Sequence, residues 1–165
     1  VREYSETIKL SFAGHFHRDD FRIVYENEKP VSYIHITPSV SPIYGNNPSY
    51  QIIEYDKSNF ELISYQTYYL KNFTGPDSAY WTFEYDFIKS YKQNSISPES
   101  YGKISKLIFA DSTYRKKYTG YYRSGDMETF SKDYDNWYYN WCGFGHLTEE
   151  EYAECICSDS LLNKK

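Results

Sequence analysis

The sequence of 165 residues lacks long apolar runs and any excess of positive charge. No segment approaches the about 20 consecutive apolar residues that cross a bilayer, and no apolar signal segment opens the chain, so we expect a soluble protein. Lys and Arg number 18 against 23 Asp and Glu, for a formal net charge of −5. The basic residues are scattered along the chain. This composition excludes a protein that binds nucleic-acid polymers by neutralising their phosphates.

An initial methionine is also missing, because the chain begins at Val1. Residues 2–9 resemble the end of an amphipathic helix whose beginning would lie upstream. The length suits one domain, or one domain with an appendage, and is sufficient to bury a core. We therefore expect a fragment or a mature portion of a longer protein.

Cysteine is scarce, and all 3 cysteines lie late in the chain, at Cys142, Cys155 and Cys157. They lack the paired Cys-x-x-Cys spacing of a zinc knuckle, and His146 is the only histidine near them, so a disulfide is favoured over a local zinc site. The segment between Cys142 and Cys155 is compatible with such a bond. Asn72-Phe73-Thr74 is an N-glycosylation sequon. Together these features indicate a secreted or lysosomal location.

Aromatic residues are abundant at 21% of the chain, and 21 of them are tyrosines. A tyrosine packs through its ring and hydrogen-bonds through its hydroxyl, so a fold rich in tyrosine can have a core that is partly polar. A surface that stacks sugars or bases is the alternative reading. The tyrosines spread over the whole sequence, which favours a role in the core.

The hydrophobic patterning divides the chain into a strand-rich part, residues 1–74, and a helical part, residues 75–165. We expect a buried strand over 8–13, further strands over 21–25 and 31–37, and a hairpin of strands 50–55 and 60–70. Apolar residues at three- and four-residue steps, with caps at Ser97 and Thr148, predict helices over 77–91, 97–108, 111–122, 126–141 and from 149 onward. The fold class is therefore α+β.

Two histidines one residue apart follow the first predicted strand, at His15 and His17. At the end of a strand, residues i and i+2 point to the same side, so both imidazoles could address one metal centre. The alternative is a pair of surface histidines in a turn. His35 lies within a predicted strand without a second ligand at strand spacing, so we expect it to be packed in the core.

Residues 38–49 contain three prolines, a glycine and two asparagines, which exclude regular structure. Loops of this kind at the ends of strands often carry specificity. Tyr44 offers a ring and Asn46 an amide, so both are candidate substrate-binding residues. A plain connecting turn is the alternative.

Taken in order, several segments resemble the acid sphingomyelinase-like phosphodiesterases, within the calcineurin-like metallophosphoesterases. The resemblance covers nearly the whole chain. It is carried by Gly14-His15-Phe16-His17-Arg18-Asp19, Pro38-Ser39-Val40-Ser41-Pro42, Asn46-Asn47-Pro48, Tyr68-Tyr69-Leu70-Lys71-Asn72-Phe73-Thr74, Ser97-Pro98-Glu99-Ser100-Tyr101-Gly102 and Tyr152-Ala153-Glu154-Cys155. The residue between the two histidines is Phe16, where the family has threonine.

The resemblance implies a hydrolase with two metal ions, usually zinc, in which His15 would bind one ion and His17 the other. Asp19 or Asp20 could orient a histidine. The family's remaining metal ligands are supplied upstream of this region, and nothing here replaces them. Two ligands do not hold a two-metal centre, so we expect this chain alone to be inactive.

The resemblance also implies the other features of the chain. Residues 1–74 would be the C-terminal strands of a metallophosphoesterase β-sandwich, and 75–165 a helical C-terminal subdomain. It supports glycosylation at Asn72, a disulfide between Cys142 and Cys155, and a substrate contact near Tyr44. The partners would be an upstream catalytic segment of the same protein and a phosphoester substrate.

The function expected is therefore that of the C-terminal portion of a zinc-dependent phosphodiesterase. Its substrate would be a sphingomyelin-like lipid, which requires peripheral contact with a membrane, or a nucleotide or similar soluble phosphoester. A non-catalytic, aromatic-rich accessory or binding module that retains a vestigial His-x-His is the competing hypothesis.

Overall fold

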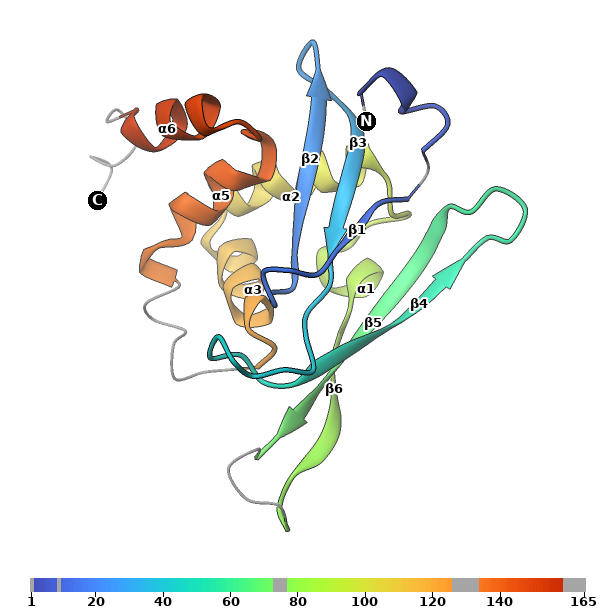
Figure 1. Cartoon of the computed structure of the whole chain (residues 1–165), viewed down its shortest axis with the longest axis vertical. Helices are drawn as coiled ribbons and strands as arrows, with labels where there is room; N and C mark the ends of the chain where they lie inside the picture. Colours follow the sequence, from blue (N-terminus) through green and yellow to red (C-terminus); the bar gives the residue numbers. More distant parts are fainter. Residues whose placement is uncertain (1, 9, 73–76, 126–133, 159–165) are drawn as a thin grey trace.

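The computed structural model describes residues 2–8, 10–72, 77–125 and 134–158, and Figure 1 shows the arrangement of their helices and strands. A short 3-10 turn, Arg2–Tyr4, precedes a three-stranded sheet, here called sheet A. Its strands are β1 (Phe12–Ala13), β2 (Asp20–Glu26) and β3 (Lys29–Ile36), in the order β1-β3-β2. β2 and β3 form an antiparallel hairpin, whereas β1 pairs in parallel with β3. The two predicted strands after the histidines are confirmed.

The strand predicted over 8–13 is wrong in length and in burial. Only Phe12–Ala13 pairs with the sheet, and both side chains are exposed. β1 is an edge strand whose side chains are exposed, and Leu10 alone of the apolar residues in this segment packs, partly buried, against the core.

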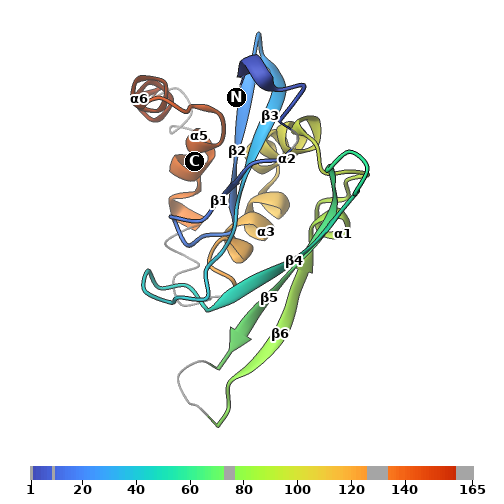
Figure 2. The same ribbon diagram turned by 45° about the vertical axis from the view of Figure 1, so that its right-hand side comes forward.

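A second three-stranded sheet, here called sheet B, consists of β4 (Ser49–Tyr55), β5 (Leu62–Lys71) and β6 (Tyr80–Asp86). All pairs are antiparallel, which confirms the predicted hairpin and its long second strand. In Figures 1 and 2 the far ends of β5 and β6 project beyond the rest of the molecule, at the opposite end from the last helix.

The helix predicted over 77–91 is wrong for its first half. Residues 80–86 form β6, and only Phe87–Tyr91 form a helix, α1. The long strand β5 offers a free edge, and the aromatic run of β6 suits a pleated surface better than a helix. The pairing register shifts between Thr67 and Tyr68, so Glu84 has no partner residue on β5 and the side chains of β6 do not alternate strictly between the two faces.

The remaining helices are α2 (Pro98–Ala110), α3 (Ser112–Tyr122), α5 (Trp137–Gly145) and α6 (Glu149–Cys157). Ser97 and Thr148 cap α2 and α6 in capping boxes, as the sequence predicts. The helix predicted over 126–141 falls partly on residues 126–133, outside the described residues, and α5 continues four residues past its predicted end. In the described part of the chain, no helix has the length and apolar character to span a membrane.

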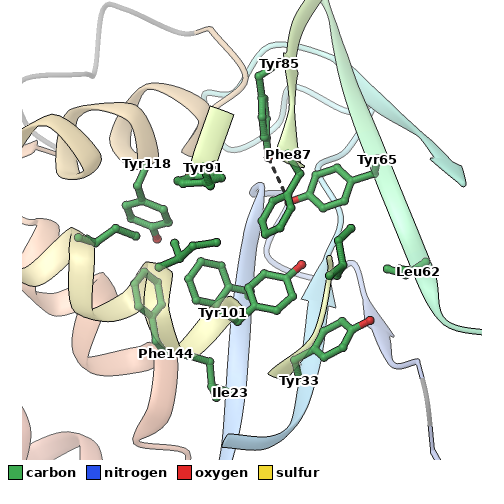
Figure 3. Close-up of a cluster of buried hydrophobic side chains, with 14 residues drawn as sticks. Ile23, Tyr33, Leu62, Tyr65, Tyr85, Phe87, Tyr91, Tyr101, Tyr118 and Phe144 are labelled. Carbon is green, nitrogen blue, oxygen red and sulfur yellow. Dashed lines mark hydrogen bonds between the residues drawn. The ribbon is translucent and has the colours of Figure 1, made fainter. Parts of the chain in front are cut away.

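The core is built mainly from aromatic rings, with Tyr101 of α2 fully buried among them (Figure 3). Strands of both sheets and the helices α1, α2, α3 and α5 all contribute side chains to this cluster. Several buried hydroxyls have partners: Tyr85 donates to Asp19, and Tyr118 donates to Asp20. The tyrosines are therefore core residues whose polar ends are hydrogen-bonded. Since the core draws on both parts of the chain, the division at residue 74 stays a prediction.

The outer face of sheet B, by contrast, exposes aromatic side chains. Tyr50, Trp81 and Phe83 are 37%, 47% and 51% exposed. The ring of Tyr50 lies 4.9 Å from Trp81 and 5.4 Å from Tyr68, measured between centroids. This face thus carries an aromatic stripe that is exposed to solvent in the described structure.

A disulfide joins Cys142 of α5 to Cys155 of α6, with 5.8 Å between the Cα atoms. It is the pairing that the family resemblance implies. Cys142 is fully buried, and the hydroxyl of Tyr138 donates to the backbone carbonyl of Cys155. Cys157 is a free, exposed cysteine. The bond therefore fastens the last described helix to α5.

Replacing both Cys142 and Cys155 with alanine should lower the free energy of unfolding by about 3 kcal/mol. A loop of this size loses roughly that much chain entropy when it is closed in the unfolded state. Denaturant titration of both proteins under non-reducing conditions measures the difference. Cys157→Ala is the matched control and should leave the stability unchanged. A loss of stability in Cys157→Ala as large as that in the double variant would contradict the assigned pairing.

Glu84 of β6 predicts a dependence of stability on pH. Its Oε2 atom is buried without a hydrogen-bond partner among the described residues, and burial raises the pKa of Glu84 from 4.5 to about 9. Below pH 4.5 both the folded and the unfolded chain hold this proton, so its stabilising contribution is complete. As pH rises towards 9, only the unfolded chain releases the proton, and stability falls by at most about 1.4 kcal/mol per pH unit.

Glu84→Gln keeps the shape of the side chain and removes its titration. Between pH 6 and 8 the free energy of unfolding should therefore decline by about 1 to 2 kcal/mol less in this variant than in the wild type. Urea titrations at several pH values test this. Glu150→Gln, on the exposed side of α6, is the control. Parallel pH profiles of wild type and Glu84→Gln would exclude a buried neutral Glu84.

Candidate functional site

The two histidines lie in a tight turn between β1 and β2, and not on a continuing strand. β1 ends at Ala13, and the backbone N–H of His17 donates to the carbonyl of Gly14 at 3.4 Å. His17 has a positive φ of 54°, a conformation that histidine adopts more readily than most residues. The expectation that strand alternation places both imidazoles on one side is therefore wrong, because the two histidines lie in a turn and the turn directs their side chains.

The imidazoles have different surroundings. His15 is exposed, and its ring lies 6.1 Å from the ring of Phe16. His17 is half-buried beside Tyr44, with 5.0 Å between ring centroids, and its Nδ1 atom is buried without a hydrogen-bond partner among the described residues. A buried nitrogen of this kind can accept a metal ion or a proton donor.

No group of three or more His, Cys, Asp and Glu side chains able to hold a metal ion occurs among the described residues. The chemistry of the two imidazoles fits zinc, and the open Nδ1 of His17 is consistent with a ligand role. His15 and His17 would thus supply only part of the ligands that a two-metal site needs.

Asp19 anchors the end of this turn beneath sheet B. Its Oδ2 atom accepts hydrogen bonds from Tyr85 at 2.8 Å, Gln51 at 3.0 Å and Thr67 at 3.1 Å. Burial raises the pKa of Asp19 to about 7, against the opposing effect of these donors. Asp20 binds Arg22 at 2.6 Å. No hydrogen bond joins either carboxylate to His15 or His17 among the described residues, so the expectation that one of them orients a histidine stays a prediction.

His35 is packed in the core, as predicted. Its Nε2 atom lies 2.7 Å from Oε1 of Gln51, and its Nδ1 atom lies 3.2 Å from the hydroxyl of Tyr101. Since an amide oxygen only accepts, Nε2 carries the proton. Burial lowers the pKa of His35 to about 4, so it is neutral at pH 7. It links Asp19, through Gln51, to helix α2.

Arg18 joins the histidine turn to the loop between β3 and β4. Its guanidinium donates to the carbonyls of His17 at 3.0 Å and Tyr44 at 2.7 Å, and to Oδ1 of Asn46 at 3.3 Å. Arg18 is only 8% exposed. The sequence carries one signal for this role, the position of Arg18 directly after His17.

Asn46 is buried, and its amide donates to the carbonyls of Ser39, Ser41 and Asn47. These bonds lie within the loop, so the side chain shapes the loop from inside. Tyr44 is 52% exposed and borders the cavity described below. The contacts of both residues with a substrate stay predictions.

The C-terminal end of α3 holds the same loop from the other side. Arg123 donates to the carbonyls of Tyr44 at 2.8 Å and Gly45 at 3.2 Å. Asn47 donates to the carbonyls of Arg123 and Ser124, at 3.2 Å through its backbone and at 2.8 Å through its side chain. Two arginines from distant segments thus share the carbonyl of Tyr44, and the helical part fixes the Tyr44 loop beside His17.

A cavity of about 490 Å³ opens at this place. Its wall comes from the histidine turn, the Tyr44 loop, the end of α3 and the start of α5. The lining residues are His15, Phe16, Arg18, Tyr44, Tyr122, Arg123, Asn136, Tyr139 and Asn140.

Residues 29–161 match the family model described as the acid sphingomyelin phosphodiesterase C-terminal region. This match covers most of the chain. The chain belongs to this family. Among similar proteins, sphingomyelin phosphodiesterase 1 of Caenorhabditis elegans is 31% identical over 129 residues, 73% of this chain and 23% of the relative.

The human cyclic GMP-AMP phosphodiesterase SMPDL3A is 27% identical over 167 residues, 94% of this chain and 36% of its own length. The human acid sphingomyelinase-like phosphodiesterase 3b is 29% identical over 133 residues, 73% of this chain and 29% of its own. The acid sphingomyelinase-like chain thus spans about a quarter to a third of these relatives, all of which are phosphodiesterases.

Arg123→Ala should loosen the Tyr44 loop of this acid sphingomyelinase-like chain. The carbonyls of Tyr44 and Gly45 lose a charged donor worth about 1 kcal/mol, so the amides of Gly45 and Asn47 should exchange with solvent roughly five times faster. Amide exchange followed by NMR measures this change. Lys116→Ala on the exposed side of α3 is the control. If the loop amides are equally protected against exchange in both variants, Arg123 does not hold the loop in place.

Proposed function

We propose that the chain is the C-terminal portion of a zinc-dependent phosphodiesterase. The observation that carries the proposal is the unpartnered, buried Nδ1 atom of His17 beside the cavity that His15 lines, in a chain of this family. His15 would hold one zinc ion and His17 the other. Bound there, the two ions would activate a water molecule and neutralise charge on the phosphoryl group.

The residues of this chain then have distinct tasks. Arg18 and Arg123 hold the carbonyl of Tyr44, which keeps the Tyr44 ring against His17 and beside the reacting group. Asp19 fixes the end of the histidine turn on sheet B. The chain contributes only two metal ligands, so an upstream segment of the longer parent protein supplies the others, and the chain alone is inactive.

The finer architecture follows from this assignment. Sheets A and B would be the closing strands of a metallophosphoesterase β-sandwich, with residues 1–74 belonging to the catalytic domain and 75–165 to a helical subdomain. Asn72 is exposed at the end of β5, where a glycan could be attached. With the disulfide, this supports a secreted or lysosomal protein.

The names of the relatives suggest two kinds of substrate, a sphingomyelin-like lipid and a nucleotide phosphodiester. The first would require peripheral contact with a membrane. A non-catalytic module with a vestigial His-x-His is the second candidate, and two histidines without a three-ligand cluster among the described residues are compatible with both. Zinc content and activity of the parent protein separate the two.

In the parent protein, His15→Ala and His17→Ala should each reduce kcat/KM for a phosphodiester about a hundredfold, because each substitution removes a metal ligand. Bound zinc should fall in parallel, as measured by atomic emission. His146→Ala is the matched histidine control, because His146 caps the C-terminal end of α5. Full activity in either site variant would overturn the assignment, and a zinc-free inactive parent protein would favour the accessory module.

A further inference from the structure

A second cavity, with a volume of about 300 Å³, lies away from the histidine turn. Four segments that are far apart in the sequence form its wall: the N-terminal residues, the start of β3, the turn before β5, and the loop that leads into α2. In Figure 1 these segments gather beside β3, on the side away from α5 and α6. The two cavities share no lining residue, so this one is separate from the histidine turn.

The wall of this second cavity carries negative charge. Glu6, Glu61 and Glu99 line it from three different segments, and none of the described lining residues is a lysine, an arginine or a histidine. None of the three glutamates forms an ion pair with another described residue. The N-terminal end of α2, which begins at Pro98, opposes this charge with about half a positive unit, and three carboxylates outweigh it. The electrostatics of the cavity therefore favour a cation.

Tyr33 brings an unpaired hydroxyl to the same cavity. The side chain is only 5% exposed, and its ring packs against Tyr101 with 4.9 Å between centroids. Figure 3 shows the hydroxyl pointing away from the Tyr101 ring, and no described residue forms a hydrogen bond with it. Burial, together with the charge of Glu61, raises the pKa of Tyr33 to about 12. The hydroxyl is therefore neutral at pH 7, and its oxygen can accept an N–H group.

The rest of the wall decides which kind of cation fits. No group of three side chains able to hold a metal ion occurs among the described residues, which favours an organic cation. A quaternary ammonium group has no N–H to donate, and Tyr33 is the one ring among the described lining residues, too few for an aromatic cage. Apolar side chains complete the wall and suit an alkyl chain: Ile8, Val31, Leu62, Ile96 and Pro98.

We propose that this cavity binds a primary ammonium group at the end of an alkyl chain. The methylene groups lie against the apolar wall, and the ammonium group donates to the carboxylates and to the hydroxyl of Tyr33. A free alkylamine and the side chain of a lysine in a peptide share this chemistry. The inference does not rest on the proposed function, because none of its residues lies in the histidine turn, and the failure of one leaves the other standing.

Binding of two amines to the 165-residue chain tests the proposal and separates the two sources. The probes are pentane-1,5-diamine and Nα-acetyl-lysine amide, and their uncharged counterparts are pentane-1,5-diol and Nα-acetyl-norleucine amide. In NMR titrations we expect at least one amine to bind about ten times more tightly than its counterpart, because the charged hydrogen bonds are lost in the latter. The same amine should shift the amide signals of Tyr33 and Glu61.

The amine that binds more tightly identifies the source, a free amine or a lysine side chain. The proposal is overturned if neither amine binds more tightly than its uncharged counterpart. Signals that shift only outside the lining residues would overturn it as well, since the attraction would then be a general effect of the net negative charge.

Two substitutions examine the polar wall. Glu61→Gln removes one charge at nearly constant shape, and Tyr33→Phe removes the hydroxyl but keeps the ring. Each should weaken binding of the amine about threefold to fivefold. Glu150→Gln and Tyr80→Phe are the matched controls, because both residues are exposed and lie outside the cavity.

Circular dichroism shows whether each variant is folded. Tyr33→Phe should fold like the wild type, since its hydroxyl has no partner among the described residues. Weaker binding in the two wall variants but not in the two controls supports the site. Folded Glu61→Gln and Tyr33→Phe variants that both bind the amine as tightly as the wild type would contradict it.

Discussion

The buried carboxyl group of Asp19 is the point on which the arrangement of the molecule depends. One oxygen collects hydrogen bonds from three side chains of sheet B, and the backbone N–H of Asp19 donates to the carbonyl of Tyr122 at the end of α3. Sheet A, sheet B and the helices therefore meet at the residue that ends the histidine turn. A buried carboxyl without these donors would be strongly unfavourable, so the position of the turn is specified by the satisfaction of this group.

The richness in tyrosine follows from the same constraint. Around Asp19 and Asp20 the core needs apolar volume and hydrogen-bond donors at the same positions, and tyrosine supplies both. Tyr85 and Tyr118 show this directly, since each buries its ring in the core and donates to a carboxylate. Phenylalanine would fill the same space but leave a buried carboxylate short of a donor. A core of this kind is specific, because each ring has one position that satisfies its hydroxyl.

The sequence predicts local structure well and long-range structure poorly. The capping residues Ser97 and Thr148, the hairpins and the packed His35 depend on neighbours along the chain or on simple periodicity, and these expectations agree with the structure. β6 was mistaken for a helix because its pairing with β5, and the register shift there, cannot be seen in its own residues. The His-x-His pattern, with the family resemblance, predicts His15 and His17 as metal ligands, but the contact of Arg123 with the Tyr44 loop joins residues 79 positions apart and leaves no local pattern. The same holds for the face of α5 that lines the cavity.

The aromatic stripe on the outer face of sheet B has a practical consequence for the isolated chain. β4 and β6 are both edge strands in the described structure, and the rings of Tyr50, Trp81 and Phe83 stand beside their unpaired backbone groups. Exposed edges next to apolar side chains are templates for pairing between molecules. Solubility, more than folding stability, therefore sets the concentration at which this chain can be handled by itself, and charged substitutions on that stripe are the first choice for keeping it monomeric.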